Sequence, residues 1–507
     1  DLRNTGHLEP IPPVQLANTR KNALGNQSGS YQRNKKERKH PERQFYTERL
    51  KRMSLFDYLK NTFLQPRLPQ ERIEEEIALN IHFRVEVVEF ADNVESRSGE
   101  TIARLLRAQE GLDVSYFEEP FSKSFLNLES RTLFDLIDRG QTILDKTGAD
   151  VLIWGYREAD KIRLNFQTPL QYEKKGNSFV SLMDSLFLPA QIFESVETFP
   201  SSIVTLIYGA VISALNTTNK PQKIQKRFLL KKTISKLSSD NSAKSLSIDY
   251  LPYIMNFLGI IYLSCCADEE KEKDFKIVRN LFETAIKHQD LIKSPIHLGC
   301  IYNHFGQLYA CTAKSANKRP AAHFKGAISS YRQAQKYLSK YNYPYDYGLI
   351  SYRLAQLYYD YWRQKEDIQA LRDAVFNLRE AEKVFTFALF PEFWADIQGD
   401  LGHMLALLGN LTNSSEISAL AITSYKNRQK IITERRDPLA WAQIQEHIGN
   451  IYYRTGKNIG NKDALEDSLE YYHDALYIYE NMERDEDGKR LTTDIAKASH
   501  ELSYLAE

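Results

Sequence analysis

The chain has 507 residues, of which 67 are basic and 66 are acidic, so its formal net charge is +1 at pH 7. This balance argues against a uniformly basic nucleic-acid-binding protein and against an acidic, solvating one. The four cysteines, with no CxxC pair among them, exclude a disulfide framework for so long a chain and favour a reducing compartment.

Residues 1–75 are predicted to be a flexible, partly disordered arm, because regularly spaced apolar residues are few there. Between residues 20 and 52 eleven basic residues stand against three acidic ones, a local balance of +8. The arm is interpreted either as an electrostatic contact for nucleic acid or an anionic membrane surface, or as a solvated linker, which we favour. The densest basic run consists of Arg33, Lys35, Lys36, Arg38 and Lys39.

Residues 76–170 are predicted to form a small α/β domain with the order β-α-β-α-β-β. Alternating or unbroken apolar residues predict its strands, and apolar residues three or four apart predict its helices. In chain order we expect a strand at 81–87, a helix from Ser98 to about 111, a strand at 112–117, a helix at 133–144 closed by Gly148, and strands at 149–154 and 162–166.

The last hairpin of this region carries a family resemblance. Residues 148–155 read GADVLIWG, and residues 162–164 read IRL. This resembles the "GADYLLxG…LRL" hairpin of TolB-like N-terminal domains, which in bacteria often precede tetratricopeptide repeats. Trp154 and Tyr156 at the strand end are candidates to line a ligand cleft, since open α/β sheets bind ligands beyond their strand ends. The alternative, which we favour, is that both are ordinary core or rim residues. Residues 171–200 are predicted to be a linker, because Pro189 and Pro200 interrupt an apolar stretch.

Residues 201–507 carry a repeat with a period of 47 to 49 residues. Its first series consists of small residues, here called marker residues, that permit close helix approach: Gly259, Gly306, Ala355, Gly402 and Gly449. Its second series consists of residues followed four places later by a large apolar or aromatic side chain and, in four of five repeats, by alanine seven places later: Val278, Ala327, Ala374, Ala421 and Ser468. Two series in one register predict repeated pairs of helices.

These two series resemble the tetratricopeptide repeat, whose ordinary length is about 34 residues. The extra residues are predicted to lie between the helices, as at 456–462. Residues 441–450, WAQIQEHIGN, are similar to the "WAxxQxxLGN" openings of long repeats in bacterial proteins. The resemblance implies a mainly α chain: an α-solenoid of tetratricopeptide-like helix hairpins after a small α/β domain. We expect five repeats, a weaker sixth beginning at Gly209, and a C-terminal capping helix over residues 491–505.

The sequence contains no GxxxxGK[ST] phosphate loop, no GxGxxG after a strand, no HExxH pair and no GxSxG elbow. We therefore expect no catalytic residue, no metal and no cofactor, and a non-enzymatic protein. An enzyme with an unrecognised site is the least favoured alternative.

In the repeat family the first helices line a concave groove with the residues three before, one after and four after each marker. Carried over to this chain, these are Asn256, Asn303, Gln307, Tyr352, Gln356, Tyr359, His403, Asn450 and Tyr453. Asn and Gln can hydrogen-bond the backbone of an extended peptide, and Tyr adds contact area with a polar tip. These positions predict a protein-protein interaction scaffold or adaptor that binds a protein or peptide partner within a larger complex.

Two further alternatives stay open: a ligand-sensing regulator acting through the α/β domain, and tethering to nucleic acid or a membrane surface through the basic arm. We expect a cytoplasmic location, with membrane association through an upstream segment as the alternative.

Overall fold

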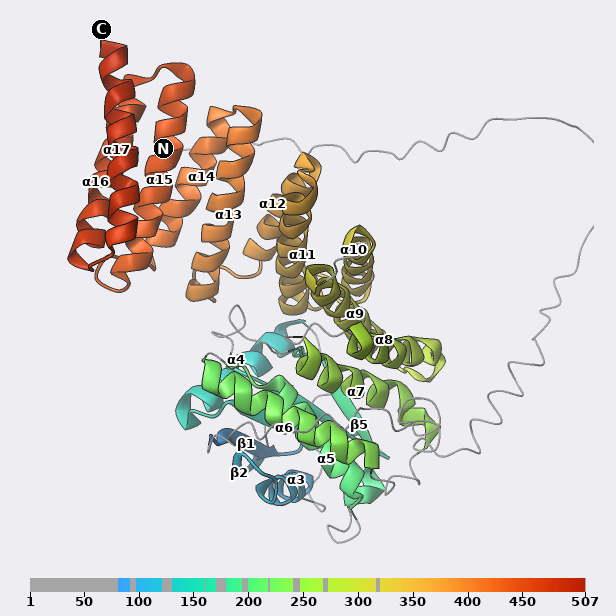
Figure 1. The fold of residues 1–507 in the computed structure, drawn as a ribbon. Coiled ribbons are helices and arrows are strands. Elements are labelled where there is room, and N and C mark those ends of the chain that lie inside the picture. The colour runs from blue at the N-terminus through green and yellow to red at the C-terminus, as the bar shows by residue number, and fades with distance from the viewer. Residues whose placement is uncertain are drawn as a thin grey trace, which may run out of the picture. The chain divides into compact units, whose positions relative to one another are not determined.

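The computed structural model describes residues 81–91, 97–120, 130–158, 160–169, 179–193, 199–217, 219–239, 247–267, 272–315 and 320–506. The predicted basic arm lies outside these residues. The described part of the chain is mainly helical, with fifteen α-helices and one five-stranded mixed sheet (Figure 1). The prediction of a mainly α protein with a small α/β part is confirmed at this level.

The sheet has the strand order β2-β1-β3-β4-β5. Its strands are β1 (Phe83–Glu89), β2 (Leu112–Pro120), β3 (Val151–Glu158), β4 (Lys161–Gln167) and β5 (Ser185–Pro189). β1 pairs in parallel with both β2 and β3, whereas β4 pairs in antiparallel fashion with both β3 and β5. The four strands that the sequence predicts are all present, so alternation and unbroken apolar runs were sufficient signals for them.

Helices α3 (Ser98–Arg107) and α4 (Ser130–Thr147) connect the three parallel strands. α3 packs in one buried cluster with Val85 and Val87, while Leu144 of α4 packs in another with Leu152. The two helices therefore cover opposite faces, as right-handed crossovers in opposite directions along a sheet require. Gly148 ends α4 with a φ of 64°, as predicted.

The linker predicted at 171–200 is wrong for residues 185–189, which form the edge strand β5. Leu186 and Leu188 are fully buried and pair with Leu164 and Ile162 of β4. The proline signal misled because Pro189 is the last residue of an edge strand, a place where a missing N–H removes no bond from the interior of the sheet. Residues 171–178 lie outside the described residues.

Helices α5 (Ser201–Ala214), α6 (Lys220–Ser239) and α7 (Leu251–Cys266) follow the sheet, with α5 packed against β4 and α7 against β5. One buried hydrophobic cluster includes residues from Phe83 in β1 to Leu308 in the helical region. The sheet and the first helices thus share a core.

Within the described residues one segment, Ile248–Cys266, has the length and mean hydropathy, 1.3, of a membrane span. In this protein 83% of that segment is buried, and a core helix of a soluble protein has the same properties. The segment therefore carries no conclusion about location.

The remaining helices follow one another in pairs (Figure 1). They are α7 with α8 (Glu272–Lys287), α9 (Pro295–Ser315) with α10 (Pro320–Tyr337), α11 (Pro344–Lys365) with α12 (Ile368–Glu382), α13 (Pro391–Thr412) with α14 (Ser415–Gln429), and α15 (Pro438–Ile459) with α16 (Lys462–Asn481) before α17 (Asp485–Ala506). The helices of a pair pack on each other, and the second helix of each pair contacts the first helix of the next. All marker residues lie on first helices, and all members of the second series lie on second helices.

Four of the five marker positions are glycine because an aromatic ring of the second helix occupies the space that a Cβ would need. A Cβ added at Gly306 would lie 2.4 Å from the ring of Tyr331, which is closer than real side chains approach. Gly259, Gly402 and Gly449 face Phe282, Tyr425 and Tyr472 in the same way. Ala355, the only marker residue with a Cβ, belongs to the repeat in which Leu378 replaces the aromatic ring. The two sequence series are therefore the two sides of one contact.

The connections within the last three pairs are short and alike. The first helix ends at a residue with positive φ, and the next residue accepts a backbone hydrogen bond that caps the second helix: Glu366 and Asp367, Asn413 and Ser414, Gly460 and Asn461. The extra residues predicted between the helices at 456–462 are thus placed wrongly, since α15 continues to Ile459 and each first helix from α11 on has 22 residues. Gly456 lies inside α15, where an added Cβ would come within 2.8 Å of the Leu465 side chain.

Candidate functional site

The first helices carry a repeated polar contact between neighbouring pairs. A residue three before one marker bonds a residue two before the next marker, at three successive junctions. Asn256 Oδ1 lies 2.8 Å from His304 Nδ1, Arg353 Nη1 donates to Asn303 Oδ1 at 3.1 Å, and Tyr352 Oη donates to Asp400 Oδ2 at 2.8 Å. We call this series the ladder, and the surface of α11, α13 and α15 beside it the first-helix wall.

A fourth contact in the ladder joins α15 to α17. Glu446, three before Gly449, accepts a hydrogen bond from Arg490 Nη2 at 2.9 Å and another from the Tyr479 hydroxyl at 2.8 Å. α17 therefore takes the place that a further first helix would have, and its buried Leu491 and Ala498 cover the last pair.

Three of the nine predicted groove residues are buried and have no surface to offer a partner. Asn256 is 6% exposed, Asn303 is 1% exposed and Gln307 is 6% exposed. The reason is the ladder itself, because a residue of the next helix bonds Asn256 and Asn303. The five predicted basic-arm residues, Arg33, Lys35, Lys36, Arg38 and Lys39, lie outside the described residues, and their role stays a prediction.

Four other predicted residues come together between α11 and α13. Tyr352 and Gln356 both donate to Asp400 Oδ2, at 2.8 and 2.9 Å, and Tyr359 Oη lies 2.8 Å from His403 Nε2. Burial, followed by the charge of Asp400, raises the pKa of Tyr352 well above its usual value. Gln356 and Tyr359 are only half-buried and His403 is exposed, so this part of the wall remains accessible.

A cavity of about 280 Å³ opens between α13, α14 and α15. It brings together two predicted residues, His403 and Asn450, with His447 and Arg454. Its remaining lining is Ala406, Leu407, Gly409, Asn410, Asn413, Ser414, Ser415, Ser418, Tyr425, Ile451, Thr455, Asn458 and Ile459. Asn450 Oδ1 accepts a bond from Tyr472 Oη at 2.9 Å, so its amide nitrogen is the end that remains to donate. No acidic side chain is among these lining residues.

The cavity lies at the junction where the ladder is interrupted. The residue three before Gly402 is Gly399, which has no side chain to bond His447. Arg428 of α14 lies there instead, since a Cβ on Gly399 would be 2.6 Å from Arg428 Nη1. Arg428 Nε is buried and has no hydrogen-bond partner within the described part of the chain.

The sequence carries a signal for Arg428. In the second series the residue seven places on is alanine in four repeats, Ala285, Ala334, Ala381 and Ala475, and arginine only here. Arg428 therefore stands where the other repeats have alanine, and Gly399 lies opposite it, so the junction between α13 and α15 differs from the others.

Both imidazoles of the cavity are held in the neutral form. Partial burial is the main cause that lowers the pKa of His403, and the positive charge of Arg363 adds to it against the opposing effect of Asp400. Partial burial also lowers the pKa of His447, with Glu446 opposing it and His403, Arg428 and Arg490 adding to it. The ring of His447 stacks on Tyr425 with 5.4 Å between centroids. At neutral pH each ring can therefore donate one hydrogen bond and accept one.

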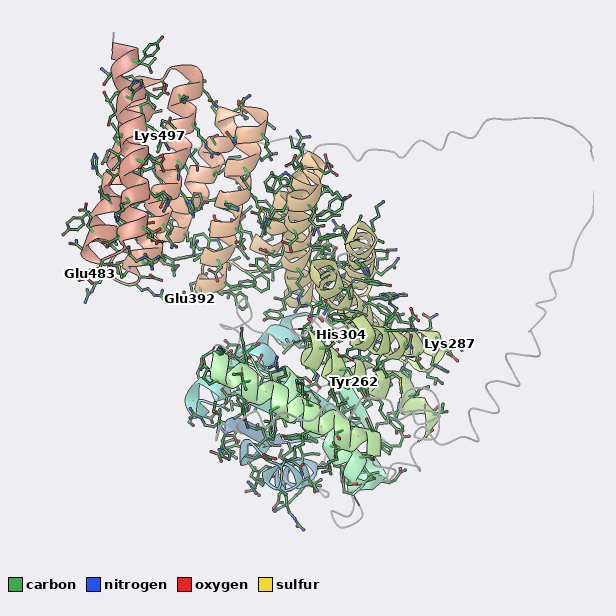
Figure 2. The ribbon with its side chains drawn as sticks, in the orientation of Figure 1. Tyr262, Lys287, His304, Glu392, Glu483 and Lys497 are labelled. Carbon is green, nitrogen blue, oxygen red and sulfur yellow. The ribbon has the colours of Figure 1, made fainter. Side chains whose placement is uncertain are left out.

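A second polar cluster joins the sheet to the helices but is enclosed. His304, labelled in Figure 2, lies on α9, and its Nε2 is 2.9 Å from Asp184 Oδ2, with both side chains fully buried. Asn165 Nδ2 of β4 donates to the backbone carbonyl of Asp184 at 3.1 Å. Cys300, 3.9 Å from the Ser181 hydroxyl, has its pKa raised well above the usual value, chiefly by burial. A protonated, enclosed thiol is a poor nucleophile, so this cluster is interpreted as structural.

Trp154 and Tyr156, the candidates to line a ligand cleft at the end of β3, are engaged internally. Trp154 is 2% exposed, and the hydroxyl of Tyr156 accepts a bond from Arg163 Nη1 at 2.8 Å. Within the described residues no group of three or more His, Cys, Asp or Glu side chains is arranged to hold a metal ion.

Comparison with known proteins supplies no family for this arrangement. No protein-family model matches the chain, and no curated protein matches it either. The first-helix wall and its cavity are therefore the features from which a function is inferred.

Proposed function

We propose that the protein is a non-enzymatic interaction scaffold or adaptor. Its helix pairs form an α-solenoid of tetratricopeptide-like hairpins, and the first-helix wall binds an extended segment of a partner protein. The observation that carries this proposal is the ladder, because the same two positions meet at three successive junctions. A register that repeats in this way sets neighbouring first helices side by side along one surface.

The contacts between α11 and α13 also support binding energetically. Asp400 holds Tyr352 and Gln356, and His403 holds Tyr359, before any partner arrives. Ordering a flexible side chain on binding costs about 0.5–1.5 kcal/mol, so a wall whose side chains are already fixed binds with less loss of entropy. The amide nitrogens of Gln and Asn and the tyrosine hydroxyls suit the backbone of an extended peptide.

The α/β part serves as the N-terminal cap of the helix pairs. The Asp184–His304 pair and the core shared by the sheet and α5–α9 cover the first helix pairs. A stack of repeats needs such a cap to shield its first apolar face. Partner binding is accordingly assigned to α11, α13 and α15, whose accessible predicted residues are Gln356, Tyr359, His403, Asn450 and Tyr453.

Site-specific photo-crosslinking in the native host tests the proposal. A photoreactive phenylalanine analogue at Tyr359 or Tyr453 reports the wall, and the same analogue at Phe376 or Tyr477, which are 57% and 62% exposed on second helices, reports other surfaces. We expect one and the same partner to be captured from both wall positions and from neither control position. Capture from the control positions alone, or no capture from the wall in a folded variant, would contradict the proposal.

A further inference from the structure

The interrupted junction differs from its neighbours in charge as well as in shape. We propose that the cavity between α13, α14 and α15 binds an acidic side chain carried by the partner's segment. This inference rests on the proposed function and deepens it by assigning the chemistry of one contact on the wall.

The first support is an excess of positive charge without a counterpart. Arg454 is exposed at the cavity, and Arg428 lies against Gly399 close enough to influence both His447 and Tyr425. Within the described residues neither guanidinium has a hydrogen bond or an ion pair. An arginine that is partly desolvated and unpaired favours a carboxylate, with which it makes strong, often bidentate bonds.

The nearby carboxylates are already engaged elsewhere. Asp400 accepts bonds from Tyr352 and Gln356, and Glu446 pairs with Arg490. The junction therefore lacks an internal anion for Arg428 and Arg454. A carboxylate from another molecule would supply it.

The second support is the set of neutral donors around the cavity. Asn410, Asn413 and Asn458 carry amide N–H groups, the amide nitrogen of Asn450 remains to donate, and the neutral imidazoles each offer one N–H. About 280 Å³ is near the lower end of ligand-pocket volumes, which suits one side chain better than a whole small-molecule ligand.

The third support is the way the altered junction departs from the repeat. At the other four junctions the polar side chain three before the marker bonds the helix that follows, which is the next first helix or, for Glu446, α17. Here Gly399 leaves that bond out and Arg428, which lies against Gly399 without lining the cavity, replaces the repeat's alanine. A partner segment on the wall would meet Gln356 and Tyr359 first and the cavity next.

The test uses the full chain and a defined probe, a fluorescent hexaglutamate peptide with blocked termini and one photoreactive group. Hexaasparagine with the same groups is the uncharged control peptide, and inorganic phosphate is the competitor. The variants are Arg454→Gln and Arg428→Ala, which restores the repeat's usual residue. Arg435→Gln, an exposed arginine in the α14–α15 connection that does not line the cavity, is the matched control. The basic arm is present in every variant, so differences among them report the cavity.

We expect hexaglutamate to bind the unaltered chain, to crosslink to α13–α15, and to bind Arg454→Gln about tenfold more weakly, which corresponds to about 1.4 kcal/mol. Arg428→Ala removes a cation that lies against Gly399 and does not line the cavity, so it should weaken binding less. The control variant should bind as the unaltered chain does. Equal affinity for all variants, crosslinks confined to residues 1–75, or phosphate binding without hexaglutamate binding would each overturn the acidic side chain as the ligand. If Arg428→Ala fails to fold, the surface change Arg454→Gln decides the outcome alone. Partner capture from Tyr453 together with unaffected hexaglutamate binding would refute this inference while leaving the proposed function intact.

Discussion

The close approach of paired helices at the marker glycines makes a quantitative prediction at Gly306. In Gly306→Ala the added methyl carbon would lie 2.4 Å from the ring of Tyr331, which is itself only 2% exposed and has no room to turn away. Overpacking of this kind costs about 1–3 kcal/mol. The same change gains up to about 1 kcal/mol from helix propensity. We therefore expect a net destabilisation of about 1–2 kcal/mol at the α9–α10 pair.

The chain itself offers a rescue and a control. Ala355 with Leu378 is a natural combination of marker alanine and aliphatic partner, so Gly306→Ala with Tyr331→Leu should be less destabilised than the sum of the two single changes. Gly488→Ala in α17 is the control, because its added Cβ would meet only Leu476 Cδ1 at 3.8 Å, an ordinary contact. That variant should gain stability from helix propensity.

Hydrogen exchange read out by mass spectrometry is the suitable assay, since stacked repeats open locally and a single global transition is not assured. Faster exchange is expected in α9 and α10 of Gly306→Ala and not in α15 and α16. If Gly306→Ala were as protected as Gly488→Ala, the ring contact would not be the reason for the marker glycine, and the physical basis of the repeat would have to be sought elsewhere.

Three further predictions concern buried polar groups. Burial lowers the pKa of His297 to about 3, so this ring stays neutral in the folded protein, while the unfolded chain takes up a proton below about pH 6.5. The free energy of unfolding should therefore fall by up to about 1.4 kcal/mol per pH unit on acidification. In urea titrations, His297→Phe should flatten this pH dependence between pH 5 and 7. Asp184→Asn leaves the fully buried His304 without its carboxylate and should lower the free energy of unfolding by about 3–5 kcal/mol. A double-mutant cycle with His304→Gln checks this prediction, because the two changes should not be additive. Arg490→Gln leaves the mostly buried Glu446 with the Tyr479 hydroxyl alone, and it should speed hydrogen exchange in α17, whereas unchanged protection there would show that this pair does not hold the capping helix.

Local signals in the sequence were sufficient for the helix pairs and for four strands. The marker glycines and the second-series aromatics were found from spacing alone, because each contact recurs every 47 to 49 residues. β5 was missed because Pro189 looks like a breaker until its place at a sheet edge is known. The extra repeat length was misplaced because Gly456 resembles a turn residue, although it serves close packing against Leu465.

The candidate groove was harder to predict than the fold. Asn303 and Tyr352 occupy equivalent positions in their repeats, yet one is buried and the other half-buried, because the residue that bonds each comes from the next repeat and differs there. A side chain's neighbours across a junction are not encoded in its own repeat. Arg428 was visible as a departure from alanine, but its meaning required knowing that Gly399 lies opposite.

The strand at Ser185–Pro189 and the core common to the sheet and α5–α9 have a practical consequence for dissecting the protein. A cut anywhere between β5 and α5 would divide one folding unit, leaving Leu186 and Ile203, both fully buried, facing water on separate fragments. Neither piece would then behave as an exchangeable cassette. Shortening from the C-terminal end, one helix pair at a time, follows the natural seams of the molecule instead.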